Sequence, residues 1–139
     1  MKRFFYIFLI VVNLFVFSGC MKSRTYTLET LSDKLFNVEI IELEEPGKVK
    51  TLYTLDEKET KEVLEFLATI EIAPILPGCN PITITGLCIR LNYADSSSLY
   101  VSNYGVRHFE NGQPSLLTFE YVVEGEKIDS YIESILSFA

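Results

Sequence analysis

A fourteen-residue apolar stretch, residues 4–17, sets the N-terminus apart from the rest of the chain. Only Asn13 interrupts it, two basic residues precede it, and the chain becomes polar soon after Cys20. A charged start, an apolar segment of this length and small residues before a cleavage site are the three parts of a secretory signal. A membrane-spanning helix needs about 20 apolar residues, and residues 4–19 number only sixteen. Residues 1–19 are therefore expected to be a signal peptide that is removed on export.

The residues around Cys20 indicate which kind of secretory signal this segment is. Phe17-Ser18-Gly19-Cys20 resembles the lipobox of bacterial lipoproteins, in which small residues precede the cysteine, although Phe17 stands where leucine is most common. The resemblance covers residues 1–20 only. It implies cleavage after Gly19 and a diacylglycerol on the Cys20 thiol. Because each buried methylene contributes about 0.8 kcal/mol, the lipid would hold the protein on the outer face of the cell membrane, or on the outer membrane of a host with two. An uncleaved anchor and free secretion are the alternatives.

The rest of the chain divides into a short linker and one domain. Residues 20–34 mix polar and charged side chains with little periodicity, and predict a lipidated N-terminus and tether. A single domain is predicted over residues 35–139. Apolar residues alternate approximately over residues 36–43, residues 45–48 give a turn signal, and residues 49–55 predict the returning strand of a hairpin.

Helical and strand periodicities alternate in the remaining sequence. Asp56 with Glu59 three positions later matches a helix capping box, and apolar residues recur behind it at helical spacing. Residues 81–93 predict a strong strand with a bulge at Gly86, where the apolar parity changes. Asn111-Gly112 predicts a tight hairpin turn, because both residues tolerate positive φ. A last helix is predicted from apolar positions at helical spacing: Ile128, Tyr131, Ile132, Ile135 and Leu136.

This order of elements predicts an α+β domain. Its antiparallel sheet is expected to combine the N-terminal hairpin with a meander of about four strands, and two helices are expected to pack on one face.

The charge balance makes one class of partner, nucleic acids, unfavourable. Without Lys2 and Arg3, 10 basic residues stand against 19 acidic ones, a net charge of −9. Because such a surface repels phosphate backbones, we expect no nucleic-acid partner.

Two cysteines remain once Cys20 is assigned to lipid. Since an exported domain meets a non-reducing space, Cys79 and Cys88 predict a disulfide. The bridge would close a ten-residue loop and contribute about 2.7 kcal/mol on the chain-entropy model. Two separate buried thiols are the alternative. The spacing and the absence of a nearby histidine do not match a zinc site, so we expect no metal and no cofactor.

The residues that could carry catalysis do not form a known pattern. His108 is the only histidine, and no Gly-x-Ser-x-Gly turn accompanies it to suggest a Ser-His-Asp site. The acidic residues 42–45 and those along the first predicted helix are expected to be solvated. We therefore predict that the protein is not an enzyme.

Tyrosines mark the region where a binding surface would be expected. They combine apolar area with a polar tip and are enriched at interfaces, although they also fill half-buried strands. The candidate surface comprises Tyr100, Asn103, Tyr104, Arg107 and Asn111. Together with the lipobox-like segment, this predicts a non-enzymatic binding module of the cell envelope, with an envelope protein as partner. The alternative is an inhibitor or immunity-type lipoprotein that acts on a hydrolase or toxin at the cell surface, since an acidic domain suits a cationic enzyme.

Overall fold

One antiparallel sheet organises the part of the chain that the computed structural model describes, which is residues 6–7, 23–45, 48–74, 85–111, 113–114 and 120–138. Its strands are β1 (Arg24–Thr25), β2 (Leu35–Glu45), β3 (Lys48–Thr54), β4 (Glu71–Pro74), β5 (Gly86–Tyr93), β6 (Ser97–Val101), β7 (Val106–Glu110), β8 (Gln113–Pro114) and β9 (Glu120–Val122). The helices are α2 (Leu28–Ser32), α3 (Glu57–Leu67) and α4 (Glu126–Phe138). None of the described helices is long and apolar enough to cross a membrane.

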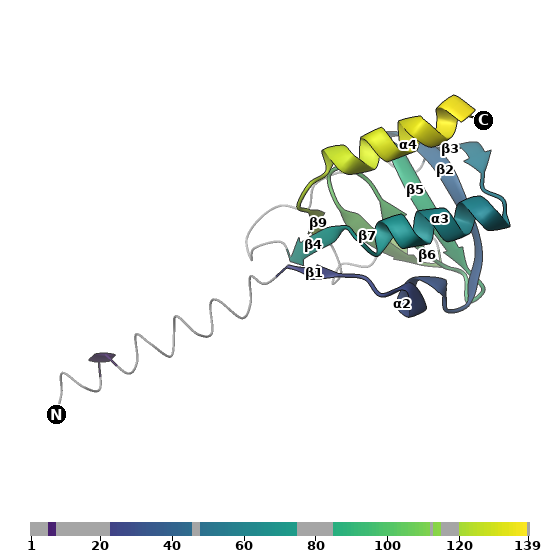
Figure 1. Ribbon diagram of the computed structural model, residues 1–139. Helices are drawn as coiled ribbons and strands as arrows, with labels where there is room; N and C mark the ends of the chain where they lie inside the picture. The colour runs from purple at the N-terminus through teal and green to yellow at the C-terminus, as the bar shows by residue number, and fades with distance from the viewer. Residues whose placement is uncertain are drawn as a thin grey trace.

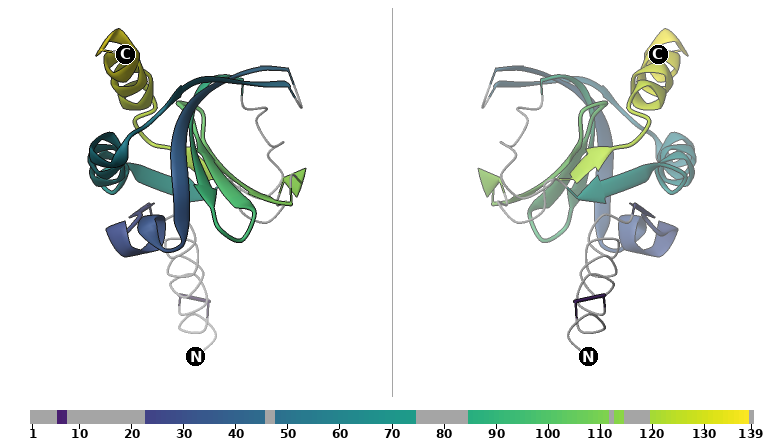
Figure 2. Two further views of the ribbon diagram at one scale, coloured as in Figure 1. Left: turned by 90° about the vertical axis from the view of Figure 1, so that its right-hand side faces the viewer. Right: turned by 90° about the vertical axis from the view of Figure 1, so that its left-hand side faces the viewer.

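The strand order is β1-β4-β9-β7-β6-β5-β2-β3, with β8 paired to β7 outside this path. The predicted N-terminal hairpin is β2–β3, and the predicted meander contains β5, β6 and β7. The sheet is strongly curved, and α2, α3 and α4 all lie on one side of it (Figure 1, Figure 2). The predicted α+β class and the placement of the helices on one face are therefore confirmed.

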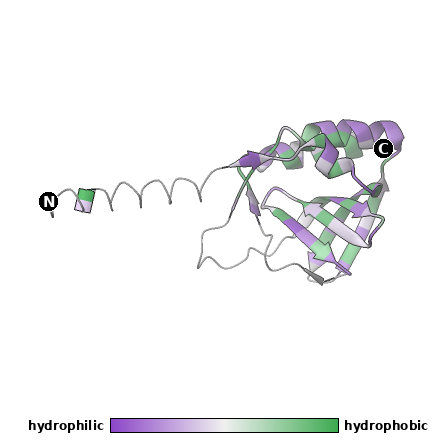
Figure 3. Cartoon of the chain, turned by 90° about the horizontal axis from the view of Figure 1, so that it is seen from below, coloured by the Kyte–Doolittle hydropathy of each residue, from purple (hydrophilic) through white to green (hydrophobic). Residues whose placement is uncertain are grey.

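Both predicted helices begin and pack as their sequences indicate. The Glu59 amide donates to Asp56 Oδ1 at 2.8 Å, and the Asp56 amide donates to Glu59 Oε2 at 2.9 Å, which completes the capping box of α3. In α4, Ile128 and Ile132 are fully buried. Hydrophilic and hydrophobic residues alternate along the strands and around the helices, as expected of elements with one buried side (Figure 3).

The main hydrophobic core lies between the helices and the sheet. Ile89 and Leu91 of β5 belong to it, together with Val63 and Leu67 of α3, and the β5 residues of the same parity, Leu87 and Tyr93, pack against it half-buried. A smaller cluster on the opposite sheet face contains Ile41, Cys88 and Tyr100. β5 is therefore buried on both faces, with Ile89 and Leu91 in the main core and Cys88 in the smaller cluster.

The first folded residues lie earlier than the sequence predicts. The segment assigned above to a tether contains β1 and α2, and it buries Tyr26 and Leu31 to 8% and 1% exposure. Thr27 caps α2 by accepting from the Thr30 amide at 3.2 Å. A two-residue strand and a five-residue helix are too short to produce a periodic pattern, which is why their sequence resembles a linker. Folded structure is therefore present within residues 23–34, upstream of the boundary predicted at residue 35.

The structure describes the predicted hairpin turn at Asn111 more fully than the predicted bulge at Gly86. Asn111 has a φ of 52° and stands between paired residues Glu110 and Gln113, as the hairpin prediction requires. Gly86 has a φ of 87° and pairs with Leu43 at the start of β5. The bulge predicted at Gly86 involves residues 81–84, which lie outside the described residues, so it stays a prediction.

Candidate functional site

The five residues predicted to form a binding surface differ in position and in exposure. Tyr100 and Arg107 face each other on neighbouring strands, and Tyr100 is only 8% exposed. Asn103 and Tyr104 form the turn before β7, whereas Asn111 follows its other end. Of the five, only Tyr104 and Asn111 are exposed. Four of the five residues thus lie on the β6–β7 hairpin and Asn111 lies beyond the far end of β7, so a shared binding surface stays a prediction.

Asn103 has a structural contact instead of a free side chain. Its Nδ2 donates to Asp129 Oδ2 of α4 at 2.6 Å. The fully buried Ser102 hydroxyl beside it accepts from the backbone amides of Tyr104 and Gly105 at 3.2 and 3.3 Å. The turn before β7 is thus fixed against α4 and closed by its own serine.

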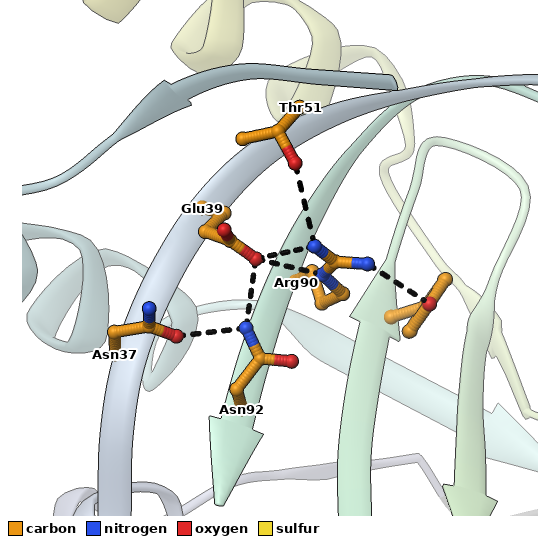
Figure 4. Close-up of polar contacts among 6 residues, drawn as sticks. Asn37, Glu39, Thr51, Arg90 and Asn92 are labelled. Carbon is orange, nitrogen blue, oxygen red and sulfur yellow. Dashed lines mark hydrogen bonds and ion pairs between the residues drawn. The ribbon is translucent and has the colours of Figure 1, made fainter. Parts of the chain in front are cut away.

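A polar network lies on the sheet face that the helices leave open (Figure 4). Arg90 Nε donates to Glu39 Oε2 at 2.9 Å, and Asn92 Nδ2 donates to the same oxygen at 2.8 Å and to Asn37 Oδ1 at 2.7 Å. The Arg90 and Glu39 side chains are 18% and 14% exposed. Burial opposes the charge of Arg90, but hydrogen bonds to Tyr100 and Glu39 outweigh it and hold the pKa of Arg90 above its ordinary value. The two charges neutralise each other and join strands β2, β5 and β6.

Breaking this pair is expected to reveal how much it stabilises the sheet. Arg90→Met should lower the free energy of unfolding by about 2 kcal/mol, because it leaves the Glu39 carboxylate half-buried without its cation. Adding Glu39→Gln should recover part of the loss, since the unpaired charge is then removed. Urea unfolding followed by circular dichroism measures both variants. A double variant less stable than Arg90→Met alone would contradict this account.

Cys88 lies in the small cluster beside this network. It is fully buried, no disulfide joins it to another described residue, and burial raises the pKa of its thiol to about 12. In the reduced form this thiol is protonated and shielded at neutral pH, which makes it a poor nucleophile. Cys79 lies outside the described residues, so the Cys79–Cys88 disulfide stays a prediction. Gly19 and Cys20, the predicted cleavage and lipid sites, also lie outside them.

His108 lines a hollow of about 240 Å³ beside Tyr26 and Tyr93. Burial lowers its pKa, so the imidazole is neutral at neutral pH. Asp95, at the rim, accepts from the amide and hydroxyl of Ser97, and no hydrogen bond within the described ranges joins it to His108. The hollow therefore brings His108 and Asp95 into one lining, with Asp95 engaged by Ser97.

A groove between α3 and α4 combines apolar and acidic side chains. It encloses about 400 Å³ and is lined by Asp56, Glu59 and Glu62 on one side and by Tyr131, Ile135 and Phe138 on the other. The rings of Phe66 and Tyr131 stack at 3.8 Å, and a second hollow of about 380 Å³ lies beside this stack. Sequence reasoning missed this groove, because its two walls are about 70 positions apart in the chain. The only signal was the aromatic residue next to each helical apolar stripe.

The described ranges contain no cluster of three or more histidine, cysteine, aspartate or glutamate residues that could hold a metal ion. Of the surfaces above, the groove is the one that combines open volume, exposed apolar area and uncompensated charge. Comparison with protein-family models, with curated proteins and with solved structures finds no match to this chain.

Proposed function

We propose that this chain is a bacterial envelope lipoprotein whose domain is a non-enzymatic binding module held close to the membrane. The lipobox-like residues 17–20 support the anchor. The observation that carries the proposal is the position of β1, where Arg24 pairs with Ile72 only four residues after Cys20. Four residues span at most about 14 Å. A lipid on Cys20 would therefore hold this sheet edge next to the bilayer.

Contacts around β1 fix the first described residues to the domain. The Arg24 guanidinium forms an ion pair with Glu120 of β9, and Ser23 Oγ donates to Glu71 Oε2 of β4 at 3.4 Å. Tyr26 then enters the main core. Because the chain is tied down so soon after Cys20, the anchor would restrict how the domain tilts on the membrane. A module held in this way presents the same surfaces outward, which suits capture of a partner in the envelope.

The anchor is tested by the intact mass of the protein purified from its host's membrane fraction, before and after reduction. We expect the mass of residues 20–139 plus diacylglyceryl, with two hydrogens gained on reduction if Cys79 and Cys88 are bridged. Cys20→Ala should retain residues 1–19 and lack lipid, because the acceptor thiol is gone. Cys88→Ala is the matched control and should keep the lipid. A wild-type mass without lipid, or with residues 1–19 retained, would refute the anchor.

A further inference from the structure

The groove between α3 and α4 has an apolar floor that remains open to solvent. Tyr131 and Ile135 are half-buried along it, and Phe138 at its end is 92% exposed. Phe138 is the most exposed large apolar side chain among the described residues. The hollow beside the Phe66–Tyr131 stack extends the groove along α4. A helix of 13 residues such as α4 is about 20 Å long, which is enough for a partner helix of three to four turns.

The charge around this floor is predominantly negative. Asp56, Glu59 and Glu62 line it against one basic residue, Lys58. Asp56 and Glu59 are engaged in the capping box, whereas Glu62 is exposed. Burial raises the pKa of Tyr131, and the charges of Glu62 and Glu65 raise it further, which places those carboxylates near the aromatic floor.

The end of α4 adds to the same negative potential. The C-terminus of a helix carries a partial negative charge that basic residues commonly offset. The last turn of α4 contains no basic residue, and this turn forms the wall of the groove that includes Ile135 and Phe138. Side-chain carboxylates and the helix dipole therefore both favour a cation at this end.

We propose that the groove between α3 and α4 binds a cationic amphipathic segment of a partner protein. Apolar side chains of that segment pack on Tyr131, Ile135 and Phe138, and its lysine or arginine side chains face Glu62 and the end of α4. The apolar floor selects a peptide over a small polyamine, and the acidic rim selects against anionic lipid. This inference rests on the proposed binding function and names its partner by charge and shape.

The test uses the full protein as isolated from its host, placed in phosphatidylcholine nanodiscs. The probe is a synthetic helical peptide of about 14 residues with leucines on one face and lysines on the other. Methyl NMR should show a saturable shift of the Ile135 signal, while Ile41, buried on the opposite sheet face, stays unchanged. The same peptide with glutamates in place of lysines should not bind. Empty nanodiscs correct for binding of the peptide to lipid.

Matched variants distinguish the groove from general attraction by an acidic surface. Glu62→Lys should weaken binding about tenfold or more, whereas Glu133→Lys makes the same charge change on an exposed α4 residue that does not line the groove and should weaken binding much less. Phe138→Ser should also weaken binding, and Phe36→Ser, at a second exposed phenylalanine, should not. Equal effects of the two lysine variants, or no shift at Ile135, would overturn the proposal. Neither result depends on the lipid mass, so anchor and groove can fail separately.

Discussion

Leu31→Ala is expected to lower the free energy of unfolding by about 3 kcal/mol, as is typical for a fully buried leucine. Leu31 is 1% exposed and belongs to the main core beneath α2. Truncation removes buried methyl groups and leaves a cavity that the sheet and α3 cannot readily fill. Urea unfolding followed by tyrosine fluorescence measures the change, because the chain contains eight tyrosines and no tryptophan.

Leu28 provides the control within the same helix. It is 47% exposed, so Leu28→Ala should change the free energy of unfolding by less than about 0.5 kcal/mol. The comparison decides whether α2 belongs to the cooperative domain or is attached to it loosely. Small and equal effects of both substitutions would show that residues 23–34 behave as the tether that their composition suggests.

Gly125→Ala is expected to be about as destabilising, at about 3 kcal/mol, because of overpacking. An added Cβ at this position would lie 1.9 Å from the Asn103 carbonyl oxygen, so one of the two backbones has to move. The turn that contains Asn103 has little freedom to do so, since Ser102 closes it and Asn103 is hydrogen-bonded to Asp129. We expect the melting temperature to fall and α4 to lose part of its contact with the sheet.

The neighbouring Glu124→Ala serves as the control for Gly125→Ala. Glu124 is exposed and forms an ion pair with Lys127 one turn later. Pairs of this kind contribute little in water, so the variant should remain within about 0.5 kcal/mol of the wild type. If Gly125→Ala matched it, the turn before β7 would be flexible enough to accept a side chain.

The elements that the sequence predicts well are those with a repeated pattern or a local signature. α3 was predictable because Asp56 and Glu59 exchange hydrogen bonds within the first turn, independently of the rest of the fold. β5 and α4 were predictable because their buried residues recur with periods of two and about 3.6. In each case the information lies within a few neighbouring positions.

The remaining features depend on contacts between distant parts of the chain. β4 has only four residues and exists because β9 and β1 pair with its two edges. The predicted binding residues are close in sequence, yet a strand carries Asn103 and Asn111 to opposite ends of β7. The groove has the opposite origin, since its walls α3 and α4 are far apart in the sequence and lie side by side only in the folded domain. Periodicity specifies an element and its buried side, but not its neighbours.

In a lipid-anchored form of this protein, the docking of β1 and α2 would set how far the domain lies from the membrane. With both elements docked, the chain segment that joins the lipid to the domain ends at β1. β1 has only two residues and is the first strand after Cys20, so a pull on the lipid would load β1 and its Arg24–Glu120 ion pair first. Release of residues 23–34 would add about 40 Å of extended chain. The domain would then lie at the membrane surface in the absence of force and farther from it under tension. Because release of α2 exposes Leu31, reburial of this side chain would favour the return of residues 23–34 to the domain.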